Sequence, residues 1–325
     1  MFLNKKVLIT GGTGMIGRAL TKQLLQKGAS LRIATLDKLS PNQKDNRVEY
    51  SITDLKYLSN CEAVCNGIDM VFQLVGTTGS PATAKERPGT FFLQNLLPNI
   101  NMLEAAWHSG VSHYLYTSTY GVYGTSPVMR EDKMWNTYPS DADKYAGWAK
   151  RMGELQIEAY SKEHNWDSLY IVRPANVYGP YANFNPLNSM VVASLIRRVV
   201  NGEDPLVVWG DGSAIRDFIH CDDVALGMIK TVEEDIKGPI NLGSGKGTSI
   251  KELIGVILDN VPNKPAIEWD QSKPQGDDIR ILDTSKAHSY GIRPRKSLSD
   301  GIKETINWYK ENHLQLNSKY NAFEI

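Results

Sequence analysis

The chain has 325 residues, and its 36 Lys and Arg are balanced by 36 Asp and Glu, so the net charge at pH 7 is zero. This length is enough for one large or two modest domains. The charge balance argues against a protein that coats nucleic acid, because such a protein needs a basic face. Hydrophobic residues make up 41% of the sequence, a proportion typical of globular proteins that excludes disordered and fibrous classes.

The number of cysteines and the length of the apolar runs indicate the cellular compartment in which the protein is expected. Cys61, Cys65 and Cys221 are too few for a disulfide framework in a chain of this size. We expect Cys61 and Cys65 at buried helical positions, and no metal site. No apolar run approaches the ~18 residues of a membrane span, and the N-terminal residues lack the pattern of a signal peptide. We therefore predict a cytoplasmic protein with neither a membrane nor a nucleic-acid partner.

Short β-rich apolar runs alternate with longer helical patterns from residue 5 to about residue 175. The runs predict strands over 7–10, 31–35, 48–51, 70–75, 113–118 and 168–173. The patterns between them predict helices that include 16–27, 90–109 and 146–163. This alternation is typical of parallel strands joined by crossover helices, so we predict an α/β fold with a Rossmann doubly wound parallel sheet.

The pattern becomes irregular after Pro174, where turn sequences such as Gly179-Pro180 follow. A helix near 222–231 and a strand over 240–242 are expected to return to the main sheet. The predicted cofactor-binding domain therefore comprises 1–176 and about 225–244. Residues 177–224 and 245–312 are predicted to form a smaller α/β substrate domain, and 313–325 a polar, mobile tail.

The first predicted strand runs directly into a glycine-rich turn that opens a helix. Gly11, Gly14 and Gly17 have the spacing G-x-x-G-x-x-G, with Met15 and Ile16 before the last glycine. A turn without Cβ atoms lets the backbone approach a pyrophosphate closely, and a helix N-terminus favours negative charge. After the first strand of an α/β pattern, this turn predicts a dinucleotide site.

The end of the second strand usually decides between NAD and NADP, through an acid for the ribose 2′-OH or a base for a 2′-phosphate. The expected position is Thr35, with Asp37 two residues later. Asp37 favours NAD, whereas Thr35 leaves NADP open. Asp54, after the third strand, is expected either to bind the adenine amino group or to cap the following helix.

Three further motifs lie at 116–124 (YTSTYGVYG), 173–180 (RPANVYGP) and 210–224 (GDGSAIRDFIHCDDV). Together with the glycine turn, they resemble the extended short-chain dehydrogenase/reductase family, in its branch of NAD-dependent nucleotide-sugar epimerases, dehydratases and reductases. The resemblance covers nearly the whole chain and implies an enzyme that acts on a nucleoside-diphosphate sugar. In that family a Ser/Thr hydroxyl, a Tyr and a Lys four residues after it oxidise a sugar alcohol, with hydride transfer to nicotinamide.

The resemblance places the family's hydroxyl on Thr119 and its lysine on Lys150. The lysine is needed because tyrosine, with a pKa near ~10, is a poor base until a nearby positive charge lowers that pKa. The resemblance also implies that the cofactor contacts a set of residues beyond the glycine turn: Thr35, Asp54, Leu55, Leu74, Val75, Gly76, Asn95, Lys150, Pro174 and Val177.

The family's tyrosine is absent, because Ala146 stands four residues before Lys150. Tyr145 is one residue away, which on a helix turns its side chain by ~100°. Two interpretations remain open: a Tyr→Ala substitution introduced to trap a ligand, or a natural loss or helix slip that recruits Tyr145. Under either, we predict that the chain as written is impaired in alcohol oxidation.

The residues after Thr119 restrict the reaction. The family's 4,6-dehydratases carry an Asp-Glu pair where this chain has Tyr120 and Gly121. Within the family the similarity is greatest to the GDP-fucose synthases (GDP-4-keto-6-deoxymannose epimerase/reductases), whose epimerising Cys and His would fall on Gly121 and Tyr181. We therefore predict redox chemistry at sugar C4, as a 4-epimerase or a 4-dehydrogenase/ketoreductase. A dehydratase that uses other residues and a catalytically silent dinucleotide-binding sensor remain alternatives.

The resemblance also implies the substrate site, formed by Thr119, Asn176, Asn188, Trp209, Arg216 and Arg280. The two guanidinium groups suit a diphosphate, and the alternative is ion pairing with Asp217 or Asp278. Trp209 favours a GDP-sugar through contact with the base, and the alternative is a core position at the domain interface. His220 is expected to be structural. The family further implies a homodimer, joined by helices that include the one carrying Lys150.

Overall fold

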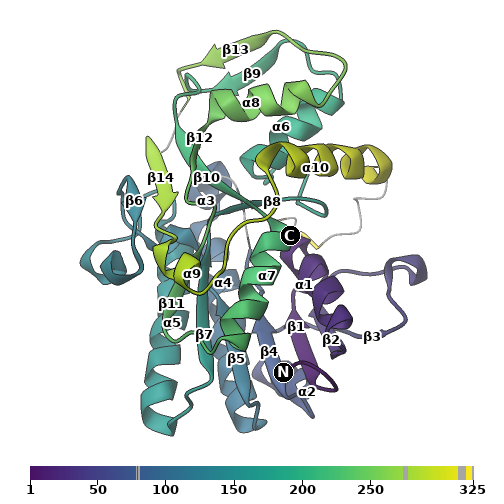
Figure 1. The fold of residues 1–325 in the computed structure, drawn as a ribbon, viewed down its shortest axis with the longest axis vertical. Coiled ribbons are helices and arrows are strands. Elements are labelled where there is room, and N and C mark those ends of the chain that lie inside the picture. Colours follow the sequence, from purple (N-terminus) through teal and green to yellow (C-terminus); the bar gives the residue numbers. More distant parts are fainter. Residues whose placement is uncertain (78, 80, 274–276, 314–319, 324–325) are drawn as a thin grey trace.

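Seven parallel strands form the main sheet of this computed structural model, which describes residues 1–77, 79, 81–273, 277–313 and 320–323 (Figure 1). The strand order is β11-β7-β5-β4-β1-β2-β3, and every adjacent pair is parallel. The predicted doubly wound sheet is thus confirmed, including the return of the strand near 240. The bounds are β1 (Lys6–Thr10), β2 (Ser30–Thr35), β3 (Val48–Ile52), β4 (Met70–Gln73), β5 (His113–Thr117), β7 (Leu169–Pro174) and β11 (Pro239–Leu242).

Helices cover both faces of this sheet because side chains on a strand alternate between faces. On β1, Val7 and Ile9 belong to the same buried cluster as α1 (Met15–Gln26) and α7 (Cys221–Glu233). Leu8 instead packs with α2 (Leu58–Cys65), α4 (Pro88–His108) and α5 (Lys144–His164). Cys61 and Cys65 are buried in α2, as predicted.

A smaller α/β part lies above the carboxyl ends of these strands (Figure 1). One of its sheets has the order β12-β10-β14-β6, with β8 also paired to β10, and a second consists of β13 and β9. Its helices α6 (Val191–Val200), α8 (Ile250–Asp259) and α10 (Leu298–Asn312) share a third buried cluster. The strands are β6 (Val128–Met129), β8 (Asn176–Tyr178), β9 (Leu206–Trp209), β10 (Ile215–His220), β12 (Gly247–Ser249), β13 (Ile267–Asp270) and β14 (Ile279–Leu282).

Short elements connect these layers: α3 (Pro81–Glu86), α9 (Ser285–Ser289) and the 3₁₀ turns η1 (Pro41–Gln43), η2 (Tyr120–Val122) and η3 (Glu131–Asn136). Within the described ranges, no helix combines the length and the apolar character needed to cross a membrane.

The order of the main sheet fixes where a ligand can enter. From β1 the chain continues to β2 and β3 on one side, whereas β4, β5, β7 and β11 follow on the other. Open α/β sheets bind their ligands at the carboxyl ends of the strands, at the point where this order reverses. In this chain that point lies between β1 and β4.

Candidate active site

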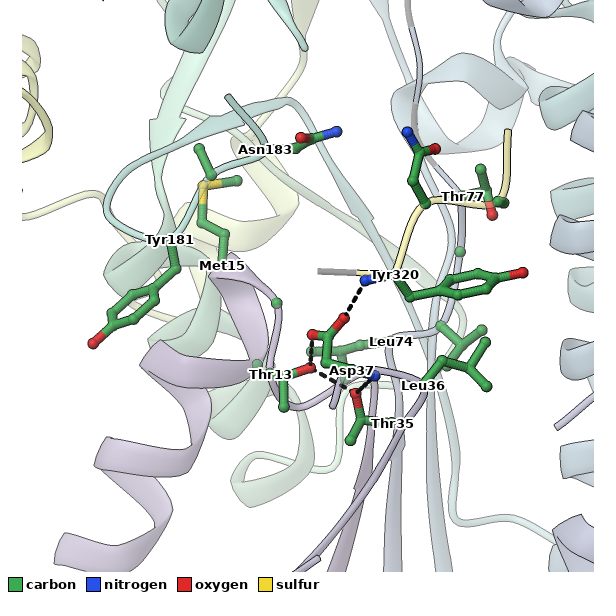
Figure 2. A pocket seen from close by; sticks show the side chains of 18 of the residues that line it. Thr13, Met15, Thr35, Leu36, Asp37, Leu74, Thr77, Tyr181, Asn183 and Tyr320 are labelled. Atoms are coloured by element: carbon green, nitrogen blue, oxygen red, sulfur yellow. Dashed lines mark hydrogen bonds between the residues drawn. The ribbon is translucent and has the colours of Figure 1, made fainter. Parts of the chain in front are cut away.

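A cleft of about 720 Å³ lies at the point where the strand order reverses. Its floor consists of the glycine turn and the segments that follow β2, β3 and β4, and its opposite wall consists of residues from 181–188. Most of the predicted cofactor residues line it, namely Gly11, Gly14, Met15, Ile16, Gly17, Thr35, Asp54, Leu55, Leu74, Val75 and Gly76. Figure 2 shows this cleft from close by.

The glycine turn is shaped to receive a phosphate group. Gly11 has a φ of +63°, and a Cβ on Gly17 would lie 2.5 Å from the Cα of Gly12. The backbone therefore packs more closely than any side chain would allow. Gly14 is the N-cap of α1 and supplies no capping side chain, so the first N–H groups of the helix are available to an anion. This turn fits the pyrophosphate of a dinucleotide.

A hydrogen-bonded network forms the floor beyond β2. The Thr13 Oγ1 lies 2.8 Å from the Thr35 Oγ1 and donates to the Asp37 Oδ2 at 2.6 Å, as Figure 2 shows. Asp37 thus holds its carboxylate at the end of β2, where a ribose hydroxyl needs an acceptor. The role of Thr13 was not predicted, although its place inside the glycine turn could have indicated it.

Asp54 lines the same cleft, and one of its two predicted roles is wrong. The N-cap of α2 is Tyr57, so Asp54 does not cap this helix. Its carboxylate instead accepts from the Lys56 backbone N–H at 3.0 Å and pairs with the Lys56 Nζ at 3.2 Å. The predicted contact with adenine stays a prediction.

Lys150 lies in a buried position beside the cleft. Its side chain is 6% exposed, and its Nζ donates to the carbonyls of Thr117 at 2.9 Å and Val75 at 3.3 Å. A Cβ on Gly76 would lie 3.3 Å from this amine and 3.1 Å from the Asn95 Oδ1, so both side chains approach Gly76. Burial lowers the pKa of Lys150 to about 7, although attraction by Glu154 opposes this shift.

The hydroxyl groups near Lys150 differ in what they contact. Ser118 donates to the buried Glu154 at 2.5 Å, and Glu154 forms an ion pair with Arg173 at 2.6 Å. Ser118 therefore belongs to the core behind the strand. Thr119, the N-cap of η2, accepts from the Gly121 backbone N–H at 3.2 Å, and its role toward a substrate stays a prediction.

No tyrosine stands at the family's position on α5. Ala146 and Lys150 are one turn apart on the same face of this helix. Tyr145 is 38% exposed, and its ring centroid lies 6.0 Å from the Nζ of its neighbour Lys144. Among the described residues, no recorded contact joins Tyr145 to Lys150 or Thr119, so the structure gives no support to the predicted recruitment of Tyr145.

The two predicted arginines are Cα partners on the neighbouring strands β10 and β14. Arg280 is buried, and its Nη1 contacts the Asp143 Oδ2 at 2.5 Å while its Nε lies 3.4 Å from the Asp277 Oδ2. Its Nη2 has no hydrogen-bond partner among the described residues, which leaves a buried donor for an anion. Arg280 thus pairs with Asp143 and Asp277 and not with the predicted alternative Asp278. The Asp217 carboxylate accepts from Ser244.

The other residues predicted to bind the substrate are Asn176, Asn188 and Trp209. Asn176 accepts from the Tyr120 hydroxyl at 2.9 Å, and Asn188 lines the cleft. Trp209, at the end of β9, is 54% exposed, so the alternative of a buried interface position is wrong. Among described residues the cleft lining does not include Asn95, Lys150, Pro174 or Val177; Pro174 ends β7 and Val177 lies in β8.

His220 has the structural role that was expected. Its Nδ1 accepts from the Asp222 backbone N–H at 3.2 Å and so caps α7. Burial lowers its pKa. The described part of the tail was missed as a contributor to the site: Tyr320, Asn321 and Ala322 line the cleft. A polar terminal segment carries no periodic signal from which such a contact could be predicted.

Comparison with known proteins agrees with this geometry. The sequence matches the NAD dependent epimerase/dehydratase family over residues 7–243. It is 29% identical to GDP-L-fucose synthase of Escherichia coli (strain K12), over 95% of this chain and 97% of that protein. It is 30% identical to GDP-L-fucose synthase 1 of Arabidopsis thaliana, over 94% of each.

Among solved structures, the fold is similar to UDP-glucose 4-epimerase of Thermotoga maritima, solved with UDP-glucose. The TM-score is 0.82 at 25% identity, over 95% of this chain and 99% of that one. The chain therefore belongs to the NAD dependent epimerase/dehydratase family, within the extended short-chain dehydrogenase/reductases, and is an enzyme with NAD as its cofactor.

Proposed function

We propose that this enzyme carries out redox chemistry at C4 of a nucleoside-diphosphate sugar, as a 4-epimerase or a 4-dehydrogenase/ketoreductase. The observation that carries the proposal is the placement of Lys150 and Thr119. The buried amine of Lys150 lies beside the cleft, anchored to the carbonyls that follow β4 and end β5, and Thr119 is the second residue after β5. NAD bound in the cleft would supply an acceptor for the sugar hydride.

Each residue then has a defined task toward the sugar. The Thr119 hydroxyl binds and orients the C4 oxygen. The Lys150 ammonium lowers the pKa of a neighbouring hydroxyl, because a nearby positive charge favours the deprotonated form. The unpartnered Nη2 of Arg280, together with Arg216 on the adjacent strand, binds the diphosphate. The Asn176 amide supports this binding from β8.

The proton acceptor is the part that this chain lacks. Ala146 has no ionisable group, and Tyr145 is exposed next to Lys144. A positioned general base contributes about 10²–10⁴-fold to the rate, so we propose that alcohol oxidation by the chain as written is impaired by about that factor.

A GDP-sugar is the proposed substrate. The GDP-L-fucose synthases are the relatives that support it, and the exposed Trp209 at the end of β9 offers an aromatic face to the base. We also propose a homodimer through α4 and α5, since Leu93 and Leu155 are exposed apolar side chains on these two helices. The cytoplasmic location stays a prediction.

The experiment compares three proteins: the chain as written, Ala146→Tyr and Ala146→Phe. The Phe variant adds the ring without the hydroxyl, so it separates proton transfer from packing. Each is incubated with GDP-, UDP-, CDP- and dTDP-sugars while cofactor absorbance and product mass are followed. We expect turnover to rise about 10²–10⁴-fold in Ala146→Tyr alone, with a GDP-sugar as the preferred substrate.

The outcomes separate the candidate functions. A product of unchanged mass without net NADH indicates C4 epimerisation, and a net change of cofactor indicates a dehydrogenase or ketoreductase. Loss of water would overturn the C4 redox proposal in favour of a dehydratase. Equal activity in the Tyr and Phe variants would show that Ala146 does not mark the site of the missing base. Inactivity of all three would favour a cofactor-binding sensor.

A further inference from the structure

Four residues near the C-terminus lie across the cofactor cleft. Tyr320, Asn321 and Ala322 line the cleft, and Ala322 is 4% exposed. The Tyr320 backbone N–H donates to the Asp37 Oδ1 at 2.8 Å, and the Asn188 Nδ2 donates to the Asn321 Oδ1 at 3.1 Å. The segment therefore touches both walls, one from the main sheet and one from the smaller part.

The segment is anchored outside the cleft by an aromatic contact. The Phe323 ring stacks on Phe91 of α4, with ring centroids 5.7 Å apart and an interplanar angle of 20°. The Arg87 side chain also donates to the Phe323 carbonyl at 3.5 Å. The segment thus contacts three separate parts of the chain. Its Tyr320 N–H binds the end of β2, its Asn321 amide binds the loop that carries Asn188, and its Phe323 ring packs on α4.

Tyr320 occupies the end of the cleft that the adenosine half of a dinucleotide requires. Figure 2 shows its ring beside Leu36 and its backbone above Asp37. The pKa of Lys56 is raised: burial opposes this shift, and Asp54 together with the more distant Tyr320 outweighs it. Asp54, which follows β3, lines the same cleft as Tyr320.

The contacts of the segment coincide with those that adenosine needs. A ribose hydroxyl requires the carboxylate at the end of β2, yet the Asp37 Oδ1 accepts from Tyr320 and its Oδ2 accepts from Thr13. The apolar side chain of Leu36 and the Tyr320 ring line the same cleft. The segment and an adenosine would therefore contact the same carboxylate in the same part of the cleft.

We propose that residues 320–323 are an intramolecular ligand of the adenosine end of the cleft and compete there with NAD. The inference concerns cofactor binding and is independent of which sugar is turned over. A tethered occupant has a high effective concentration. The apparent dissociation constant of NAD rises as the open fraction falls, so a segment that is docked nine-tenths of the time weakens NAD about tenfold.

The test measures binding to cofactor-stripped full-length chain by calorimetry, with NAD, AMP and NMN as separate ligands. AMP probes the adenosine end, and NMN, which lacks adenosine, is the internal control. Three variants are compared: Tyr320→Ala, Phe323→Ala, which removes only the anchor outside the cleft, and Tyr290→Ala, a control at an exposed tyrosine remote from the segment. Melting temperatures confirm that each variant is folded.

We expect NAD and AMP to bind about tenfold more tightly to Tyr320→Ala and Phe323→Ala, with NMN affinity and Tyr290→Ala unchanged. Weaker AMP binding in these two variants would overturn the proposal, because it would make the segment a strap that holds the nucleotide in place. Unchanged AMP binding would overturn it as well, since the segment would then not compete. Both readouts are independent of turnover and of the proposed sugar.

Discussion

The buried amine of Lys150 makes the stability of the protein depend on pH in a defined way. Its side chain is 6% exposed, and burial lowers its pKa from 10.5 to about 7. In the unfolded chain the pKa returns to ~10.4. The substitution Lys150→Met removes the titrating group and keeps an unbranched apolar side chain at the same place.

The size of the effect follows from this difference in pKa. Below about pH 7 the amine is protonated in both states, and the folded state carries the full cost of a buried charge, about 5 kcal/mol for a shift of this size. Between pH 7 and 10.5 the unfolded chain keeps the proton that the folded chain has released, so the free energy of unfolding rises with pH. From pH 6 to pH 9 this single group contributes a rise of about 2–3 kcal/mol.

The assay is urea unfolding at pH 6, 7, 8 and 9 on protein freed of cofactor. The free energy of unfolding of Lys150→Met is subtracted from that of the unsubstituted chain, which cancels every other titrating group. In the variant the carbonyls of Val75 and Thr117 lose their donor, but this cost does not vary with pH. Lys162→Met is the matched control, because this lysine lies on the same helix with a side chain that is 74% exposed.

We expect the difference between the unsubstituted chain and Lys150→Met to grow by about 2–3 kcal/mol from pH 6 to pH 9, and the difference for the control to stay flat. Parallel curves for the unsubstituted chain and Lys150→Met would refute the reasoning, since they would show that the amine keeps an ordinary pKa in the folded state.

Three substitutions test other parts of the site. Gly17→Ala places a Cβ 2.5 Å from the Gly12 Cα, so we expect loss of NAD affinity and a lower melting temperature; a variant with unchanged NAD binding by calorimetry would contradict the close packing of the turn. Glu154→Gln leaves the buried Arg173 without its carboxylate and should cost about 3–5 kcal/mol of unfolding free energy, measured by urea denaturation, whereas a cost below about 1 kcal/mol would show that the charge pair is not needed. Asp54→Asn keeps the shape of a side chain that lines the cleft; we expect about tenfold weaker AMP binding at an unchanged melting temperature, and equal affinity would remove Asp54 from the adenine site.

The sequence could predict the main sheet because its signals are local. The main-sheet strands β1–β5 and β7 are short β-rich apolar runs, and the glycine turn has a fixed spacing after β1. The pairing of β10 with β14 and β8 joins segments far apart in the chain, and short strands such as β6 carry too few residues for a periodic pattern. Such contacts depend on the assembled fold.

The same distinction applies to the site. Thr119 and Lys150 follow from motifs, but the partners of charged groups do not. Arg280 contacts Asp143, which lies 137 positions earlier in the sequence, whereas Asp278, two positions earlier, was one of the expected alternatives. Asp54 was a candidate cap because a helix follows it, and the helix begins only at Leu58. Trp209 is exposed at the last position of β9. The composition of the sequence does not indicate where a strand ends or which of its side chains face solvent.

The register that pairs Arg216 with Arg280 also bears on how such a site diversifies. Paired residues on parallel strands project from the same face, and side chains alternate with a period of two. A residue gained or lost inside β10 or β14 would send one guanidinium to the opposite face. A change of length in the connection before Ile279 leaves both strands in register. Selection can thus remodel the surroundings of a sugar through loop length while the pair of arginines is inherited intact.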